Sequence, residues 1–150
     1  MDSLNKWLML AANLGVIAGI IFLAIEVNQN TQVAQSSARQ EVLNAELWVF
    51  EKIIEDPSIK LGDIPFQFEG LNEEQSTKQA NLYNAIFRIR ENLWLQYLNG
   101  VLDETTWLSY RATFVYFLKN NENMRQYWNW LSESGMDRNF VNEIELYIQE

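Results

Sequence analysis

The sequence predicts an all-α protein: one N-terminal transmembrane helix continues into a long juxtamembrane helix, and a small aromatic-rich helical bundle follows. Near the start, the chain has nineteen consecutive residues without a charge. Elsewhere, apolar residues recur every three or four positions, which is the helical period. The alternation of apolar and polar residues that marks a strand is not found between turn signals. A chain of 150 residues has room for one domain and an appendage.

The uncharged stretch runs from Trp7 to Ile25, between Lys6 and Glu26, and Asn13 is its only polar member. As a helix it spans about 28 Å, close to the roughly 30 Å hydrocarbon core of a bilayer. Two alternatives are a cleaved signal peptide and a buried core helix. The first lacks a small-residue cleavage site, and the second normally shows a polar stripe. We therefore expect residues 1–26 to form a transmembrane anchor.

The charges flanking this anchor are nearly balanced. Lys6 and the α-amine oppose Asp2 on the amino side, whereas Glu26 and the distant Arg39 follow on the other side. The slight positive excess before the anchor favours a cytoplasmic N-terminus, but it leaves the side of the C-terminal head open.

No helix breaker follows the anchor until Pro57, so residues 27–56 are predicted to continue it as a long juxtamembrane helix. Its second half is amphipathic, and Glu46 is expected on the polar side. The apolar stripe needs a partner, either the rest of the chain or a second copy. It has a heptad-like core of Leu43, Leu47, Phe50 and Ile54, widened by Val42, Val49 and Ile53.

Residues 57–72, which contain both prolines, are predicted to be a connecting loop, and residues 73–150 a helical bundle head. Asn72, with Gln75 three residues on, matches a capping box, and Asp103 matches an N-cap. Gly100 follows the end of the first helix. The expected helices cover residues 73–98, 104–119, 123–133 and about 137 to the end, and their aromatic stripes are expected in the core.

The composition argues against several functions. There are 20 Asp+Glu against 11 Lys+Arg, a net charge of −9, which is unfavourable for binding nucleic acid. The chain has no His and no Cys, which removes the commonest general base, metal ligand and thiol nucleophile. The adjacent acids of the sequence stand at expected helix ends and give no reason to assign a general acid and base, and the sequence has no phosphate loop and no metal-ligand spacing. We expect a protein that is not an enzyme and needs no cofactor or metal.

A row of small residues in the anchor predicts self-association, because small side chains let membrane helices approach closely. Together with the juxtamembrane stripe, it makes the membrane, further copies and other membrane subunits the expected partners. The candidate oligomerisation residues are Ala11, Gly15, Ala18, Gly19, Leu43, Leu47, Phe50 and Ile54.

Polar residues at the membrane exit allow a second function, a small oligomeric ion channel. In a ring of helices they would form a polar collar, and a ring of Glu26 carboxylates would attract cations. The simpler reading is that helices leave membranes through polar residues. The candidate pore or collar residues are Asn13, Glu26, Asn28, Gln29 and Asn30.

Two arginines interrupt the aromatic stripes of the head. Arg90 and Arg111 are expected to stack on neighbouring rings or to pair with an acid such as Glu91 or Glu104.

The segment AANLGVIAGIIFLAIEVNQNTQ, followed by ENLWLQYLNGVLDETTW, resembles an uncharacterised family of small bacterial single-span membrane proteins. This resemblance implies a bacterial source and a place in the inner (cell) membrane, but it supplies no catalytic residue. In some members a basic residue precedes the Q-N-T motif, where this chain has Asn28. We thus expect a non-enzymatic, membrane-anchored homo-oligomeric structural or interaction protein, or an accessory subunit of a membrane complex. The matching residues are Asn13 to Gly19, Gln29 to Thr31, Asn92, Gln96, Tyr97, Gly100, Asp103 and Trp107.

Overall fold

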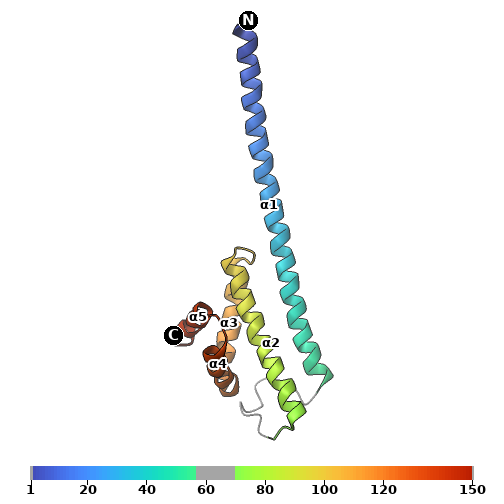
Figure 1. Cartoon of the computed structure of the whole chain (residues 1–150), viewed down its shortest axis with the longest axis vertical. Helices are drawn as coiled ribbons and strands as arrows, with labels where there is room; N and C mark the ends of the chain where they lie inside the picture. The colour runs from blue at the N-terminus through green and yellow to red at the C-terminus, as the bar shows by residue number, and fades with distance from the viewer. Residues whose placement is uncertain (1, 57–69, 150) are drawn as a thin grey trace. The chain divides into compact units, whose positions relative to one another are not determined.

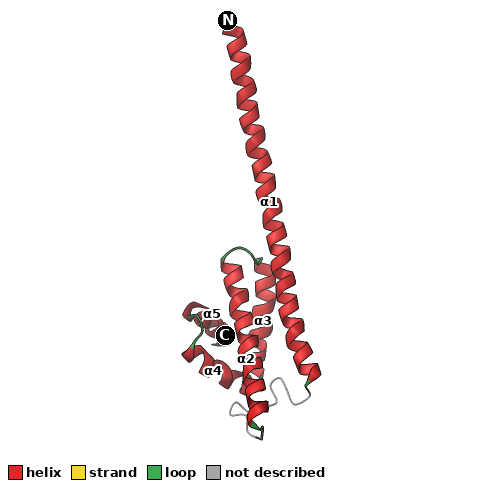
Figure 2. Cartoon of the chain, turned by 45° about the vertical axis from the view of Figure 1, so that its right-hand side comes forward, coloured by secondary structure: helices red, strands yellow, loops and turns green. Residues whose placement is uncertain are grey.

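A computed structural model describes residues 2–56 and 70–149 of the chain, which form five α-helices and no strand (Figure 2). Most of the expected connecting loop, residues 57–69, lies outside the described residues. The chain divides into two compact units, Met1–Ser37 and Ala38–Glu150. The helices are α1 (Asp2–Glu55), α2 (Glu73–Leu98), α3 (Glu104–Asn120), α4 (Glu122–Ser134) and α5 (Arg138–Gln149).

Residues 2–37, the described part of the first unit, are the first part of α1. All side chains from Ser3 to Ala34 are exposed, including the whole apolar stretch of the expected anchor. By length and composition, α1 is long and apolar enough to cross a membrane. The helix continues through residues 28–31, because α1 is one element from Asp2 to Glu55.

In the second unit, residues 38–55 of α1 lie alongside α2 and run in the opposite direction, and α3 returns beside α2 (Figure 1 and Figure 2). The shorter helices α4 and α5 close the other side of α3. Val42 and Val49 join α1 to a single hydrophobic core that draws on every helix of this unit. The all-helical head expected from the sequence is confirmed for the described residues.

Helices α2 and α3 begin where the sequence predicts. The Gln75 amide donates to Asn72 Oδ1 over 2.9 Å, and the Asn72 amide donates to Gln75 Oε1 over 3.1 Å, which completes the capping box. At α3, the Thr106 amide donates to Asp103 Oδ1 over 3.0 Å. Gly100 has a φ of +71°, a left-handed conformation that favours glycine in the turn after α2.

The break between α3 and α4 is shorter than the four-residue stretch expected at 120–123. Asn121 alone separates the two helices, with an extended backbone, and its side-chain Oδ1 accepts the amide proton of Met124 over 2.9 Å. One residue therefore ends α3 and caps α4.

The aromatic stripes meet in the core of the head, as expected. Phe114 lies edge-on to Trp128 with ring centroids 5.6 Å apart, and Phe140 meets the same indole at 5.8 Å. Phe87 and Trp107 are also fully enclosed. Such edge-to-face pairs add about 0.5–1.5 kcal/mol each beyond the area they bury, so the aromatic residues hold α2 to α5 together.

Candidate functional site

The small residues of the anchor lie on an exposed part of α1. Ala11, Gly15, Ala18 and Gly19 are all exposed. A Cβ atom added at Gly15 or Gly19 would meet nothing within 4 Å. The absence of side chains at these two positions is therefore unrelated to packing inside one copy.

The polar collar residues are also exposed, and part of their hydrogen bonding is local. The Gln32 amide donates to Asn28 Oδ1 over 2.9 Å, and the Thr31 hydroxyl donates to the carbonyl of Val27 over 2.9 Å. Asn13 and Glu26 have exposed side chains on the same unit. The structure thus presents the predicted polar atoms outward, on a continuous helix.

The apolar stripe of the juxtamembrane segment divides into two faces in the second unit. Val42 and Val49 are 4% and 7% exposed and face the core, and Ile53 packs against it. The four heptad-like residues remain outside. Leu43 and Leu47 are 46% and 55% exposed, Phe50 is 53% exposed and Ile54 is 79% exposed. The head itself therefore covers only half of the stripe.

Three ion pairs hold the inner face of this segment to the head. Arg39 binds the Asp103 carboxylate through both Nε and Nη2, and Lys78 Nζ lies 3.1 Å from Asp56 Oδ2, just after α1. Between them, Nη1 of Arg90 lies 2.6 Å from Oε1 of Glu46. These contacts fix which face of residues 38–55 remains outside.

The position of Glu46 differs from the sequence-based expectation. Its side chain is only 21% exposed and points to α2, because it lies one helical turn from both Val42 and Val49 on the buried face. The charge of Glu46 led to the prediction that it lies on the polar side, although its spacing from Val42 and Val49 indicates the buried face.

The two arginines of the head stack on rings, as expected, but their acidic partners are different. Arg90 lies over Tyr110 at 5.4 Å and pairs with Glu46, and Arg111 lies over Tyr147 at 3.6 Å and pairs with Glu143 at 3.1 Å. The acids proposed from sequence neighbourhood were wrong, since the true partners lie in helices far along the chain.

The Asp103 carboxyl group of the head has a large pKa change. The hydrogen bonds from Arg39, and then from the Thr106 hydroxyl, lower its pKa from 3.8 to about 2. The same carboxylate caps α3, so one side chain joins α1 to the start of α3.

Within residues 2–56 and 70–149, no group of three or more acidic side chains could hold a metal ion. Acids near the core pair instead with arginines: Glu91 with Arg88 at 2.6 Å, and Glu145 with Arg125 at 2.9 Å. The feature of this structure that most needs a partner is therefore the outer face of α1.

Comparisons of the chain with protein families, with curated proteins and with solved structures found no match. The resemblance to a bacterial single-span family remains a prediction from the motifs.

Proposed function

We propose that this protein is a non-enzymatic, membrane-anchored homo-oligomer, which acts as a structural or interaction protein or as an accessory subunit of a membrane complex. The observation that carries this proposal is the outer stripe of α1, the side chains of Leu43, Leu47, Phe50 and Ile54, which the head leaves exposed. Complete burial of a fully exposed Leu, Ile or Phe side chain contributes about 1.5–3 kcal/mol, so covering these partly exposed side chains contributes a fraction of that each.

The anchor supports the same proposal. An uncharged stretch from Trp7 to Ile25, exposed along its whole length, is accounted for when lipid surrounds it. Copies inserted in one membrane in the same sense are parallel, and confinement to a plane raises their effective concentration. The proposed location is the inner (cell) membrane of a bacterium, with the side of the head open.

The spacing of residues supports a parallel pair of helices. Gly15 and Leu43 are 28 residues apart in the sequence, and so are Gly19 and Leu47. In a left-handed supercoil, residues separated by whole heptads lie along one line of contact between the helices, the seam. Because 28 residues are four heptads, Gly15 and Leu43 share one heptad position at this contact, and Gly19 and Leu47 share the other. Ala11 and Ala18, which share the next heptad position, leave room beside such a seam.

The absence of cysteine from the chain makes the seam directly testable. Leu47→Cys places a thiol on the outer stripe, and Glu41→Cys places one on an exposed position of the same helix away from the seam. After mild oxidation in native membranes, we expect a disulfide-linked dimer for Leu47→Cys and monomer for Glu41→Cys.

A second variant tests the mass of the assembly. Leu47→Asp puts a charge on the stripe without touching the core, so light scattering of the detergent-solubilised chain should show monomer where the parent chain shows dimer or higher. A monomeric parent chain, or equal cross-linking at positions 41 and 47, contradicts the proposal.

The alternative function is a channel whose lining includes the exposed collar from Glu26 to Asn30. One variant separates it from a sealed assembly. Glu26→Gln lowers the preference for cations in planar-bilayer recordings if the collar lines a pore. The absence of any conductance from the purified parent chain excludes the channel.

A further inference from the structure

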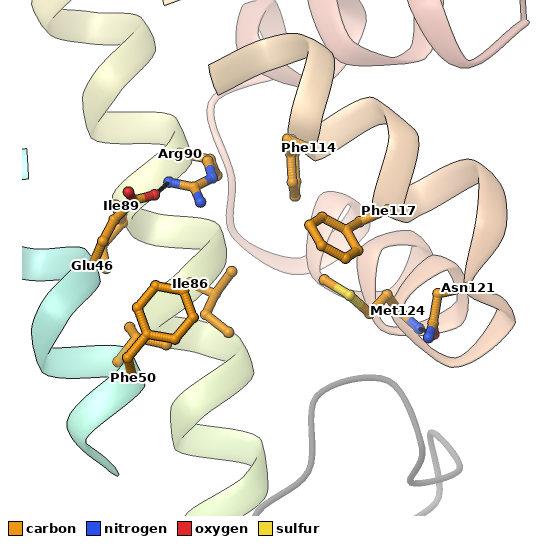
Figure 3. Close-up of a pocket in the computed structure, with 10 residues that line it drawn as sticks. Glu46, Phe50, Ile86, Ile89, Arg90, Phe114, Phe117, Asn121 and Met124 are labelled. Atoms are coloured by element: carbon orange, nitrogen blue, oxygen red, sulfur yellow. Dashed lines mark hydrogen bonds and ion pairs between the residues drawn. The ribbon is translucent and has the colours of Figure 1, made fainter. Parts of the chain in front are cut away.

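An apolar hollow of about 160 Å³ lies in the head between α1, α2, α3 and the start of α4 (Figure 3). Its inner wall is formed by buried side chains of all four helices, Val49, Ile86, Phe114 and Met124. The rings of Phe50 and Phe117 stand at its opening and are 53% and 49% exposed. The hollow is therefore open to solvent between two phenyl rings.

The size of the hollow defines what fits. Protein interiors hold few voids larger than a water molecule, because side chains close them. In another protein, an engineered apolar cavity of about 150 Å³ stays dry and binds benzene. A hollow of about 160 Å³ has the same capacity. It accepts one six-membered ring, and the remainder of a larger molecule can extend through the opening.

The charges in the wall select a neutral occupant. Glu46 and Arg90 line the hollow, but they neutralise each other across 2.6 Å, and the Arg90 guanidinium also lies over the Tyr110 ring. An anionic ligand would have to displace Glu46 from Arg90, and a cation would have to displace Arg90. Asn121, at the rim, uses its Oδ1 to accept the Met124 amide proton. The pairing leaves no net charge for a ligand to match.

The apolar wall favours an aromatic ring over a linear chain. Three phenyl groups surround the space, and aromatic rings in contact prefer offset or edge-to-face packing. The sulfur of Met124 adds a polarizable contact to a ring edge. We propose that this hollow binds one neutral aromatic ring, either as a small molecule or as the end of a larger one, inserted between Phe50 and Phe117.

Methionine-methyl NMR tests the proposal on the full-length chain in nanodiscs. The chain has four methionines, of which Met124 lines the hollow, Met136 is buried elsewhere in the head and Met9 belongs to the anchor. Titration with benzyl alcohol should shift the Met124 signal saturably. Met136 should not move, and Met9 should at most drift in proportion to the alcohol that partitions into lipid.

Filling the hollow provides the matched control. Ile89→Phe adds bulk to a lining residue of α2 and should abolish the saturable shift, whereas Leu95→Phe, on the same helix outside the hollow, should leave it unchanged. Phe117→Ala removes one ring of the opening at a half-exposed position and should weaken binding about three- to tenfold.

A Met124 signal that does not move would overturn the proposal, and so would a Met124 shift that rises without saturation, like that of Met9. Saturable binding that survives Ile89→Phe in a folded head would overturn it as well. Benzoate at neutral pH should bind much more weakly than benzyl alcohol. Equal or tighter binding of benzoate contradicts the requirement for a neutral ring. Phe50 also belongs to the stripe proposed for self-association, so the Leu47→Asp variant, which leaves that stripe uncovered, should bind at least as well as the parent chain.

Discussion

At the scale of single residues, Asp103 joins α1 to the start of α3. Its Oδ1 accepts the Thr106 amide proton at the start of α3, and its Oδ2 accepts hydrogen bonds from Arg39 and the Thr106 hydroxyl. Each bond favours the charged carboxylate, which explains why the pKa of Asp103 is about 2. The helix cap was predictable because its signal is local, but the bond to Arg39 was not, because that residue lies 64 positions away.

The lowered pKa of Asp103 predicts a pH dependence of stability. A carboxyl whose pKa falls on folding stabilises the folded state above its unfolded pKa, and that contribution disappears as the pH drops from about 4 to about 2. Asp103→Asn keeps a capping oxygen but loses the ion pair, so its unfolding free energy should approach that of the parent chain over this pH range. Circular dichroism during urea unfolding measures the difference.

The control for this effect is Asp103→Ala, which removes the cap as well. It should cost about a further 1 kcal/mol at neutral pH, as helix N-caps do. A constant gap between Asp103→Asn and the parent chain from pH 4 to pH 2 would rule out the titration of Asp103 as the cause.

Two enclosed tryptophans predict unequal effects of the same substitution. Trp128 Nε1 donates a hydrogen bond to Glu145, whereas Nε1 of Trp107 is buried and has no hydrogen-bond partner among residues 2–56 and 70–149. Both indoles are almost fully enclosed, so replacement by Phe removes a similar apolar area. Trp128→Phe should cost about 1.5–3 kcal/mol more than Trp107→Phe in urea unfolding, the usual value of a bond to a charged group. Equal costs would show that the Trp128 bond contributes nothing.

At the scale of elements, α1 shows which features the spacing of apolar residues can predict and which it cannot. The heptad-like pattern predicted an amphipathic helix, and α1 is helical throughout that segment. Spacing could not decide which apolar residues meet the head and which remain outside, because Val42 and Leu43 are neighbours in one broad stripe. That choice depends on long-range pairs such as Glu46 with Arg90, whose partners come from different helices.

The starts of α2 and α3 were easier to predict. Asn72 and Asp103 act on amides three residues ahead, so the whole interaction lies within one window of sequence. Asn121 acts in the same way at α4, but the sequence-based prediction began that helix one residue late, at 123. The apolar hollow had no such signal, since its walls come from four helices that the sequence cannot place beside one another.

The contact between α1 and α2 predicts a non-additive pair of substitutions. The Glu46 and Arg90 side chains are 21% and 16% exposed, so removing one charge leaves the other in a poorly hydrated place. Glu46→Gln or Arg90→Met alone should each destabilise the head by about 1–3 kcal/mol. The double variant should cost less than the sum of the two, as measured by urea unfolding. Strictly additive costs would mean that the pair is not coupled.

At the scale of the whole molecule, the open space at Gly15 and Gly19 allows substitutions that test self-association without affecting the fold of one chain. Because a Cβ at either position meets nothing within 4 Å, Gly15→Ile with Gly19→Ile leaves each copy unstrained. If the row packs against another copy, energy transfer between labelled chains in lipid should show at least about a tenfold weaker association, about 1.4 kcal/mol.

The matched control for these glycines is Ile17→Phe, a larger side chain on the opposite side of the same helix, which should leave association unchanged. Similar losses for both variants would point to a general effect of bulk in the anchor. No loss for the glycine variant would remove the anchor from the association surface.

The ion pairs along residues 38–56 determine how far along the head this part of the chain lies. Arg39 carries a positive charge and pairs with Asp103, whereas Glu46 and Asp56 carry negative charges and pair with Arg90 and Lys78. A slide of α1 by one helical turn would carry each charge about 5.4 Å from its partner. The charge pattern therefore favours one axial position of the helix, and it fixes which side chains of residues 38–55 face outward.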